Sequence, residues 1–204
     1  MLTLADGRVL LEDAIRYALS VAQHVPPDLL HSPTPCADWD LHMLLEHLSE
    51  SVGTLAEGLA TGFLGPEPEH AEISRVDAED LGTALLATLR LRCAGLLAAW
   101  VTVPPGQMVA LGPHELSASL MSCAGAIEIA VHGWDVSAAC GSPQPVPTNL
   151  ADRLLQLAPL LVTDATRAGQ FGKPVPEPAS PTEGDRLVAF LGRNPAWLAA
   201  ASPG

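Results

Sequence analysis

Glu128 and His132 are the two residues whose types and spacing most clearly indicate chemistry. They lie four residues apart in the mostly apolar run 126–136, AIEIAVHGWDV. On a helix, positions i and i+4 stack on one face, with Cβ atoms about 5–6 Å apart. Burying either group without a partner costs roughly 2–7 kcal/mol, and more for a charge. A divalent metal ion would satisfy the carboxylate and the imidazole together, and a hydrogen-bonded pair without metal is the competing interpretation.

A metal centre needs a third ligand from elsewhere in the chain, and His47 is the best-placed histidine. It lies on the flank of an apolar stripe that includes Leu44, Leu45 and Leu48, within a helix expected over 37–62. Crossing or antiparallel helices in a bundle can bring such a flank beside the helix that carries Glu128 and His132. The other histidines weighed as ligands are His24, His31, His42, His70 and His114.

These other histidines are weaker candidates because of their positions. His42 is rotated nearly opposite Leu48, on a face that we expect to be solvated and where it can pair with Glu46. His70 and His114 lie in or beside predicted loops.

Two further residues near these motifs have chemical potential. Asp135, three residues after His132, can accept the second ring N–H of that histidine as an outer partner, or it can cap or pair elsewhere. Cys36 directly precedes a predicted helix, where a thiol pKa can fall, but a buried structural cysteine is the more ordinary interpretation. The sequence contains no Gly-rich phosphate loop and no G-x-S-x-G motif.

Helical spacing of apolar residues predicts an all-α fold. The expected helices cover about 8–24, 37–62, 77–101, 115–140 and 150–169, and a short helical piece at 185–191 lies in a Pro-rich tail. Asp38 or Asp40 can cap the second helix. We expect 64–76 to be a polar connection and 102–114 to be a loop that can hold a short extended piece.

Four long amphipathic helices with lengthy connections predict a four-helix bundle. The fifth helix and the tail are expected to pack outside the bundle or to cover one end. We expect one domain overall, in which 1–142 forms the metal-binding bundle and 143–204 packs on it.

Composition limits the partners and the location. The formal net charge of −13, from 23 acidic and 10 basic residues, disfavours nucleic acids and anionic membranes. The beginning of the sequence lacks the basic and apolar regions of a signal peptide. The apolar stretch 81–103 is interrupted by Arg90 and Arg92, so we expect no membrane span. Four cysteines without C-x-x-C spacing favour reduced thiols and a cytoplasmic location.

Three blocks of the sequence resemble one known family. The segment TPCADWDLHMLLEHL, 34–48, resembles the opening motif of the DinB-like / mycothiol-dependent maleylpyruvate isomerase metal-binding superfamily. The segment EIAVHGWDVSAACG, 128–141, resembles the second motif of that group, and the tail 169–197 is similar to one common in an actinobacterial subfamily. The blocks occur in the right order and span most of the chain.

The resemblance implies a divalent metal, usually zinc, held by His47, Glu128 and His132. It also implies a DinB-like four-helix bundle with a long crossover, and often a homodimer. Members with known activity use a low-molecular-weight thiol such as mycothiol for S-transfer to a small electrophile or for isomerisation. Three protein ligands leave one metal position open, as in catalytic zinc sites.

We expect the substrate pocket between the helices that carry these ligands. The residues expected at its edge are Met43, Ser51, Met121 and Trp134, with Asp135 behind His132. The sequence identifies no general base and no arginine for anchoring the thiol. Two other functions stay open: a different small-molecule reaction in specialised metabolism, with or without metal, and a non-catalytic small-molecule binding protein.

Overall fold

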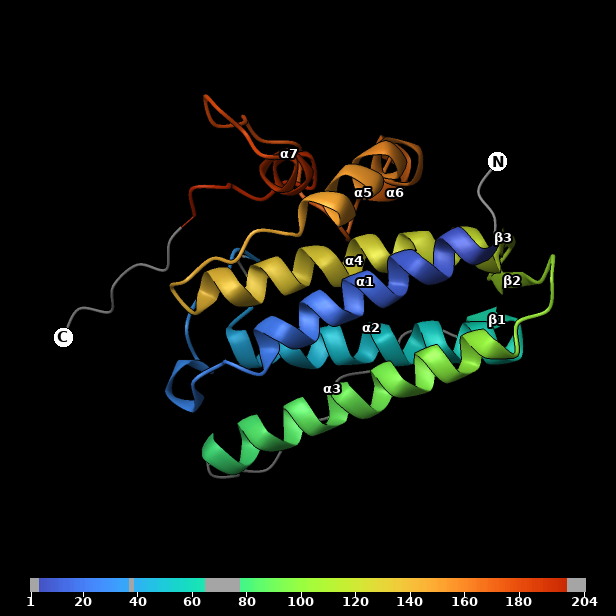
Figure 1. The fold of residues 1–204 in the computed structure, drawn as a ribbon, viewed down its shortest axis with the longest axis horizontal. Coiled ribbons are helices and arrows are strands. Elements are labelled where there is room, and N and C mark those ends of the chain that lie inside the picture. The colour runs from blue at the N-terminus through green and yellow to red at the C-terminus, as the bar shows by residue number, and fades with distance from the viewer. Residues whose placement is uncertain (1–3, 37–38, 65–77, 198–204) are drawn as a thin grey trace.

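The computed structural model describes residues 4–36, 39–64 and 78–197. Asp38, His70 and most of the expected connection 64–76 lie outside the described residues. Four long helices form the body of the molecule, and they run side by side in Figure 1. They are α1 (Leu4–Ala22), α2 (Leu41–Thr61), α3 (Ala78–Val101) and α4 (Ala118–Ala139). The all-α, four-helix-bundle prediction is therefore confirmed in its main features.

The apolar stripe of α2 makes it the centre of the bundle, in contact with both α3 and α4. Leu41, Leu44 and Leu48 are each no more than 1% exposed. Asp40 caps the helix by accepting a hydrogen bond from the backbone N–H of Met43 at 2.9 Å, as expected for one of the two candidate caps. The helix ends at Gly62, whose φ of 74° is the left-handed conformation that glycine adopts readily.

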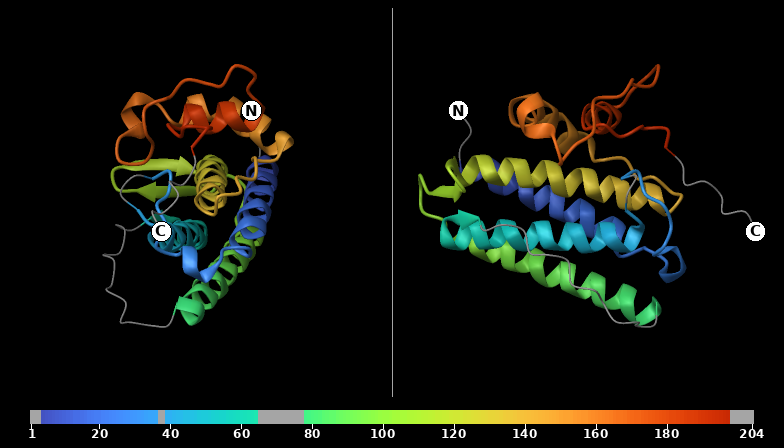
Figure 2. Two further views of the ribbon diagram at one scale, coloured as in Figure 1. Left: turned by 90° about the vertical axis from the view of Figure 1, so that its left-hand side faces the viewer. Right: turned by 180° about the vertical axis from the view of Figure 1, so that it is seen from behind.

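Helix α4 is buried on all sides, which differs from the amphipathic helix expected there. Its buried residues include Ile127, Val131 and Val136, each with 0% exposure. Helices α1 and α2 contact it, and the C-terminal helices lie over its remaining face (Figure 2). A helix enclosed in this way needs apolar residues around its whole circumference rather than along one stripe.

A small sheet closes one end of the bundle, where only a short extended piece was expected. It consists of β1 (Phe63–Leu64), β2 (Met108–Leu111) and β3 (His114–Ser117), in the order β1-β2-β3. Strands β1 and β2 are parallel, and β2 and β3 form an antiparallel hairpin. The prediction of helix from 115 is wrong, because 115–117 belong to β3 and α4 begins only after its cap, Ser117.

The C-terminal part forms a layer over α4, as expected for a segment that packs outside the bundle (Figure 1). Its helices are α5 (Thr148–Leu161), α6 (Asp164–Arg167) and α7 (Glu183–Phe190). The single helix expected over 150–169 is wrong. Val162 leaves the helical conformation with φ −106° and ψ 76°, and Thr163 then starts α6 with a capping box to Thr166.

Helix α3 uses only part of its surface for packing. Leu89, Leu96 and Trp100 face the bundle, whereas Leu91 is 75% exposed. By length and composition alone, Asp80–Val101 could span a membrane, and 22% of its most apolar window is buried. We expected Arg90 and Arg92 to exclude a membrane span, but the composition of this helix does not exclude one. In the structure α3 packs along α2.

Candidate metal centre

His47, Glu128 and His132 come together between α2 and α4. Glu128 Oε1 lies 3.2 Å from His47 Nε2 and 3.0 Å from His132 Nε2. The two imidazole rings meet edge to face, with centroids 5.1 Å apart. The sequence spacing therefore placed Glu128 and His132 on one helix face, and the apolar stripe of α2 placed His47 opposite them.

The site is partly open to solvent. The side chains of His47 and Glu128 are 18% and 21% exposed, whereas His132 is 3% exposed. A ligand can therefore approach His47 and Glu128 from solvent, while His132 is fixed from behind.

Asp135 fixes the orientation of His132. Its Oδ2 lies 3.0 Å from His132 Nδ1, and its side chain is fully buried. Asp135 accepts the Nδ1–H, so the Nε2 of His132 faces Glu128. Of the two roles that the sequence left open for Asp135, the structure shows the outer partner of His132 together with an ion pair to Arg193 at 3.1 Å.

Burial and neighbouring charges shift the pKa values of Glu128, His132 and Asp135. Burial would raise the pKa of Glu128, but the charge of His132 and hydrogen bonds from both histidines lower it well below its usual range. Burial would lower the pKa of His132, but Glu128 and the hydrogen bond to Asp135 raise it. Burial of Asp135 is likewise outweighed by Arg193 and His132, which lower its pKa. In the metal-free protein the site is thus a carboxylate–imidazolium network.

The three groups fit a divalent metal ion by their chemistry and their spacing. A tetrahedral zinc ion with bonds of about 2.0–2.1 Å places neighbouring ligand atoms about 3.3 Å apart. The ligand atoms of His47, Glu128 and His132 all lie within 4.8 Å of one another, and two of the separations are 3.0 and 3.2 Å. A cation at this position would replace the protons that now join the imidazoles to Glu128.

The four residues expected at the pocket edge are only partly near the site. Ser51 Oγ is 3.4 Å from His47 Nε2, and Met43, one turn before His47, is 42% exposed. Met121 is buried against α2 beside Gly58, two turns away from Glu128.

Trp134 is 4% exposed. It lies two positions after His132, about 200° around α4, so its side chain leaves the helix on another face than that of His132.

None of the other described histidines joins the centre. His24 contacts the Ser20 carbonyl, His31 pairs with Asp40, and His114 is exposed on β3. His42 lies 3.6 Å from Glu46, as the spacing suggested, but the solvated face expected there is wrong. Its side chain is 16% exposed, and its Nε2 is buried without a hydrogen-bond partner.

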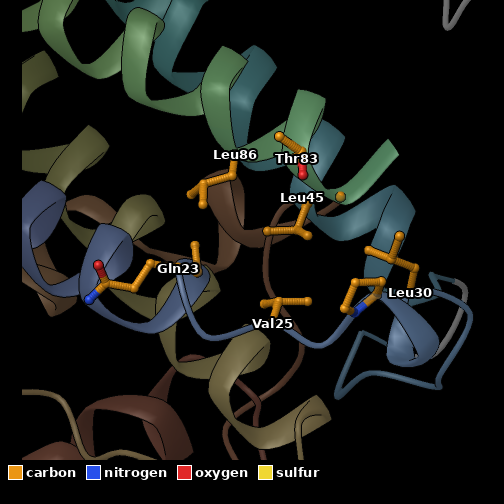
Figure 3. A pocket seen from close by; sticks show the side chains of 9 residues that line it. Gln23, Val25, Leu30, Leu45, Thr83 and Leu86 are labelled. Atoms are coloured by element: carbon orange, nitrogen blue, oxygen red, sulfur yellow. The ribbon is translucent and has the colours of Figure 1, made fainter. Parts of the chain in front are cut away.

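A cavity of about 160 Å³ lies elsewhere, where the end of α1 and the short 3₁₀ helix Pro27–Leu29 meet α2 and α3 (Figure 3). Its lining is mostly apolar and comprises Ala22, Gln23, Val25, Pro27, Leu30, Leu45, Gly82, Thr83 and Leu86. Leu45 and His47 are two positions apart on α2, so they point to opposite sides of that helix. The cavity is therefore separate from the candidate metal centre.

The family model described as the mycothiol maleylpyruvate isomerase N-terminal domain matches residues 11–137. The chain belongs to this family. The matched segment includes His47, Glu128 and His132, which the sequence resemblance had implied as ligands.

The chain is also similar to two relatives in sequence and to two solved structures in fold. The uncharacterized protein Rv0738 of Mycobacterium tuberculosis strain H37Rv and its counterpart in strain CDC 1551 are each 29% identical over 178 residues, covering 84% of this chain and 88% of the relative. A crystal structure of the mycothiol-dependent maleylpyruvate isomerase has a TM-score of 0.60 at 16% identity, covering 88% of this chain and 81% of that one. A histidine-to-alanine variant of the isomerase gives a TM-score of 0.58 at 15% identity over the same shares. At these identities the structural likeness concerns the fold.

In this member of the maleylpyruvate isomerase family, two residues at the site had no role in the sequence analysis. The ring of Trp39 lies 4.3 Å from that of His47 and 6.0 Å from that of His132, so it covers one side of the site. Trp39 is part of the first resembling motif, which was the available signal. Arg193 lies in the tail block, far from the matched domain in sequence, and only that block pointed to it.

Cys36 is half-buried and lies beside the candidate metal centre. Its Sγ lies 3.3 Å from Asp135 Oδ2 and 3.3 Å from Arg193 Nη2. The thiol therefore belongs to the group of side chains behind His132.

Proposed function

We propose that this protein is a metal-dependent enzyme, with zinc as the expected metal, that uses a low-molecular-weight thiol such as mycothiol. Its reaction would be S-transfer to a small electrophile or isomerisation through a thiol adduct. The convergence of His47 Nε2 and His132 Nε2 on Glu128 Oε1, at 3.2 and 3.0 Å, carries the proposal. A zinc ion with three protein ligands keeps a fourth position open and lowers the pKa of a thiol bound there.

The residues of the chain supply orientation and shielding. Asp135 holds the His132 ring so that Nε2 faces the open side of the site. Trp39 packs against His47 and shields it from water on one side. Ser51 and Met43 lie one turn to either side of His47 on α2, where they would contact a bound thiol or electrophile.

Family membership supports the thiol and the enzymatic nature of the proposal. The matching family and both solved structures are named for mycothiol-dependent isomerisation of maleylpyruvate. The substrate of this chain is proposed only as a small electrophile, because the fold likeness does not transfer substrate specificity.

Elemental analysis of the purified protein tests the metal. We expect about one zinc per chain, lost in His47→Ala and in Glu128→Ala. His114→Ala is the matched control, because His114 is an exposed histidine on β3. Zinc retained at full stoichiometry in both site variants would refute the proposed ligands.

Thiol consumption tests the reaction. Zinc-loaded protein is assayed with mycothiol and a panel of electrophiles that includes maleylpyruvate, and Glu128→Ala is expected to abolish turnover. Zinc binding with thiol binding but no turnover on the whole panel would support the alternative of a small-molecule binding protein. Turnover of an electrophile without any thiol would support recruitment of the bundle to a different reaction.

We also propose a cytoplasmic protein, on the basis of its four cysteines without C-x-x-C spacing, and a homodimer, on the basis of the family resemblance. Sedimentation velocity at micromolar concentration decides the second point. A mass near the 21.2 kDa of one chain would refute the homodimer.

A further inference from the structure

We propose that Arg193, from the C-terminal segment, is a positioning residue of the metal centre: it locks Asp135, which in turn orients His132. This inference rests on the proposed metal centre and assigns a role in it to a residue outside the matched family domain. Arg193 itself makes no contact with the three ligand candidates among the hydrogen bonds described, so it would act through Asp135.

Arg193 contacts both carboxylate oxygens of Asp135. Arg193 Nη2 donates to Asp135 Oδ2 at 3.1 Å, and Nε lies 3.3 and 3.4 Å from its two oxygens. The side chains are 6% and 0% exposed. The planar guanidinium fork fixes both the position and the rotation of a carboxylate, which a single-point cation cannot do.

The chain holds Arg193 in place through its backbone. Gly192 has a φ of 85°, and a Cβ added to it would lie 2.5 Å from Gly172 Cα. Only glycine fits this close crossing of two loop segments. The Arg193 N–H donates to the Val188 carbonyl at 2.9 Å, and its Nη1 donates to the Leu191 carbonyl at 2.9 Å. These contacts hold the backbone and the guanidinium of Arg193 in place independently of the ion pair with Asp135.

Asp135 Oδ2 accepts hydrogen bonds from Arg193 Nη2 and from His132 Nδ1 at the same time. Without Arg193, a fully buried carboxylate would lose its compensating charge and could rotate away from His132. The Nδ1–H of His132 would then lose its acceptor, and Nε2 would no longer be directed at the metal position. Loss of such outer partners typically weakens metal binding 10–100-fold.

The Arg193 guanidinium also lies where a metal ion bound by Cys36, His132 and Asp135 would otherwise sit. Cys36, His132 and Asp135 form a second group whose potential ligand atoms lie within 4.8 Å of one another. Arg193 Nη2 contacts both Cys36 Sγ and Asp135 Oδ2, at 3.3 and 3.1 Å. Arg193 thereby supplies the positive charge behind His132 and leaves the Nε2 side as the position for the metal.

Zinc affinity of Arg193→Met, measured by competition with a chromophoric chelator, is the first test. We expect a decrease of at least about tenfold. Arg193→Lys keeps the charge without the fork and is expected to fall between Arg193→Met and the wild type. Arg186→Met is the matched control, because Arg186 lies in the same segment but pairs with Glu183 at a 45% exposed position. Affinity of a folded Arg193→Met within twofold of the wild type would overturn the inference.

A double-mutant cycle with Asp135→Asn separates positioning from general destabilisation. If Arg193 acts through Asp135, the double variant should bind zinc as weakly as Asp135→Asn alone. Fold losses that simply multiply would overturn the inference. Circular dichroism confirms that each variant is folded, and Arg193→Lys replaces Arg193→Met in the cycle if the latter does not fold.

The cobalt-substituted wild-type protein provides a spectroscopic check. We expect no cobalt–thiolate charge-transfer band, because Arg193 occupies the space beside Cys36. A strong band that disappears in Cys36→Ser would place the metal on the Cys36 side and overturn the inference. If His47→Ala and Glu128→Ala lower zinc affinity while Arg193→Met does not, the inference fails and the proposed metal centre stands.

Discussion

At the scale of single residues, Glu128 is the group on which the candidate site depends. One of its oxygens, Oε1, contacts both histidine Nε2 atoms; the contact with His47 joins α4 to α2, and the contact with His132 lies within α4. In the proposed centre the same carboxylate would bind the metal, so Glu128 would stabilise both the metal-free and the metal-bound protein. These two roles can be separated by working with a chelator present.

Glu128→Gln is expected to destabilise the metal-free protein by about 1–3 kcal/mol, because it removes the charge that both histidines face. Glu128 has a lowered pKa, so its contribution is present above its ordinary pKa of 4.5 and is lost as the pH falls through the lowered value. His132 has a raised pKa, so its contribution is complete below 6.5 and is lost as the pH rises through the raised value.

The stability difference between the wild type and Glu128→Gln should therefore be largest between pH 4.5 and 6.5. Urea denaturation with a chelator at a series of pH values measures it. A difference that increases continuously above pH 8 would contradict the assignment of His132 as the partner.

The sequence was sufficient to predict the three ligand candidates and to offer Asp135 as an outer partner of His132, but it did not predict Arg193. Helical spacing places Glu128 and His132 on one face, and the α2 stripe places His47 near the bundle interior. Arg193 follows Asp135 by 58 positions, and no periodicity connects a loop residue to a helix at that distance. Its contact depends on how the C-terminal layer folds over α4, which local pattern does not specify.

At the scale of elements, α1 and α4 pack closely because small residues lie at their contact. A Cβ added at Gly133 would lie 3.2 Å from the Ala18 Cα and 3.1 Å from the Tyr17 ring. A Cβ at Gly7 would lie 3.0 Å from the Ser119 carbonyl oxygen. At these two glycines the backbones of α1 and α4 are so close that a side chain larger than a hydrogen atom would require a shift of its neighbours.

Gly133→Ala is expected to destabilise the protein by about 1–3 kcal/mol, since the new methyl group would crowd both the buried Tyr17 ring and the Ala18 backbone. The better helix propensity of alanine offsets up to about 1 kcal/mol of this cost. Equilibrium denaturation measures the change. An increase in stability would show that α1 can shift away from α4 without loss.

Gly95→Ala is expected to act in the opposite direction, with a stabilisation of about 0.5–1 kcal/mol. Gly95 lies on the exposed side of α3, and a Cβ there would meet no atom within 4 Å. The same denaturation experiment compares it with Gly133→Ala. Destabilisation by Gly95→Ala would indicate that this face of α3 is covered in solution.

The sequence predicted the long helices well and the short elements poorly. The α2 stripe fixed its position because leucines and Val52 recur along its buried face at helical spacing. The strands are two to four residues long, too short for an alternating pattern, so β3 was assigned to the start of α4. The break at Val162 carries no glycine or proline of its own, and the capping box of Thr163 was the signal that was overlooked.

At the scale of the whole molecule, the C-terminal layer is tied to the bundle by polar contacts as well as by apolar packing. The Gln144 carbonyl accepts a hydrogen bond from Tyr17 Oη at 2.7 Å, and the Gln144 N–H donates to Ser137 Oγ at 3.1 Å. Arg193 adds the ion pair to Asp135. The division at residue 142 stays a prediction, and these contacts favour the single domain that we expected overall.

We therefore expect one cooperative unfolding transition for the metal-free chain. The layer covers α4 on the face that α1 and α2 leave open, so its detachment would expose buried apolar residues and the carboxylate of Asp135.

Thermal unfolding followed by far-ultraviolet circular dichroism should coincide with unfolding followed by tryptophan fluorescence, because Trp100 and Trp134 report on the bundle and Trp197 on the tail. Replacing Trp197 by Phe removes the tail signal and should leave the midpoint by fluorescence unchanged. An earlier transition that disappears in Trp197→Phe would show instead that the layer opens independently, and then Arg193 could hold Asp135 only part of the time.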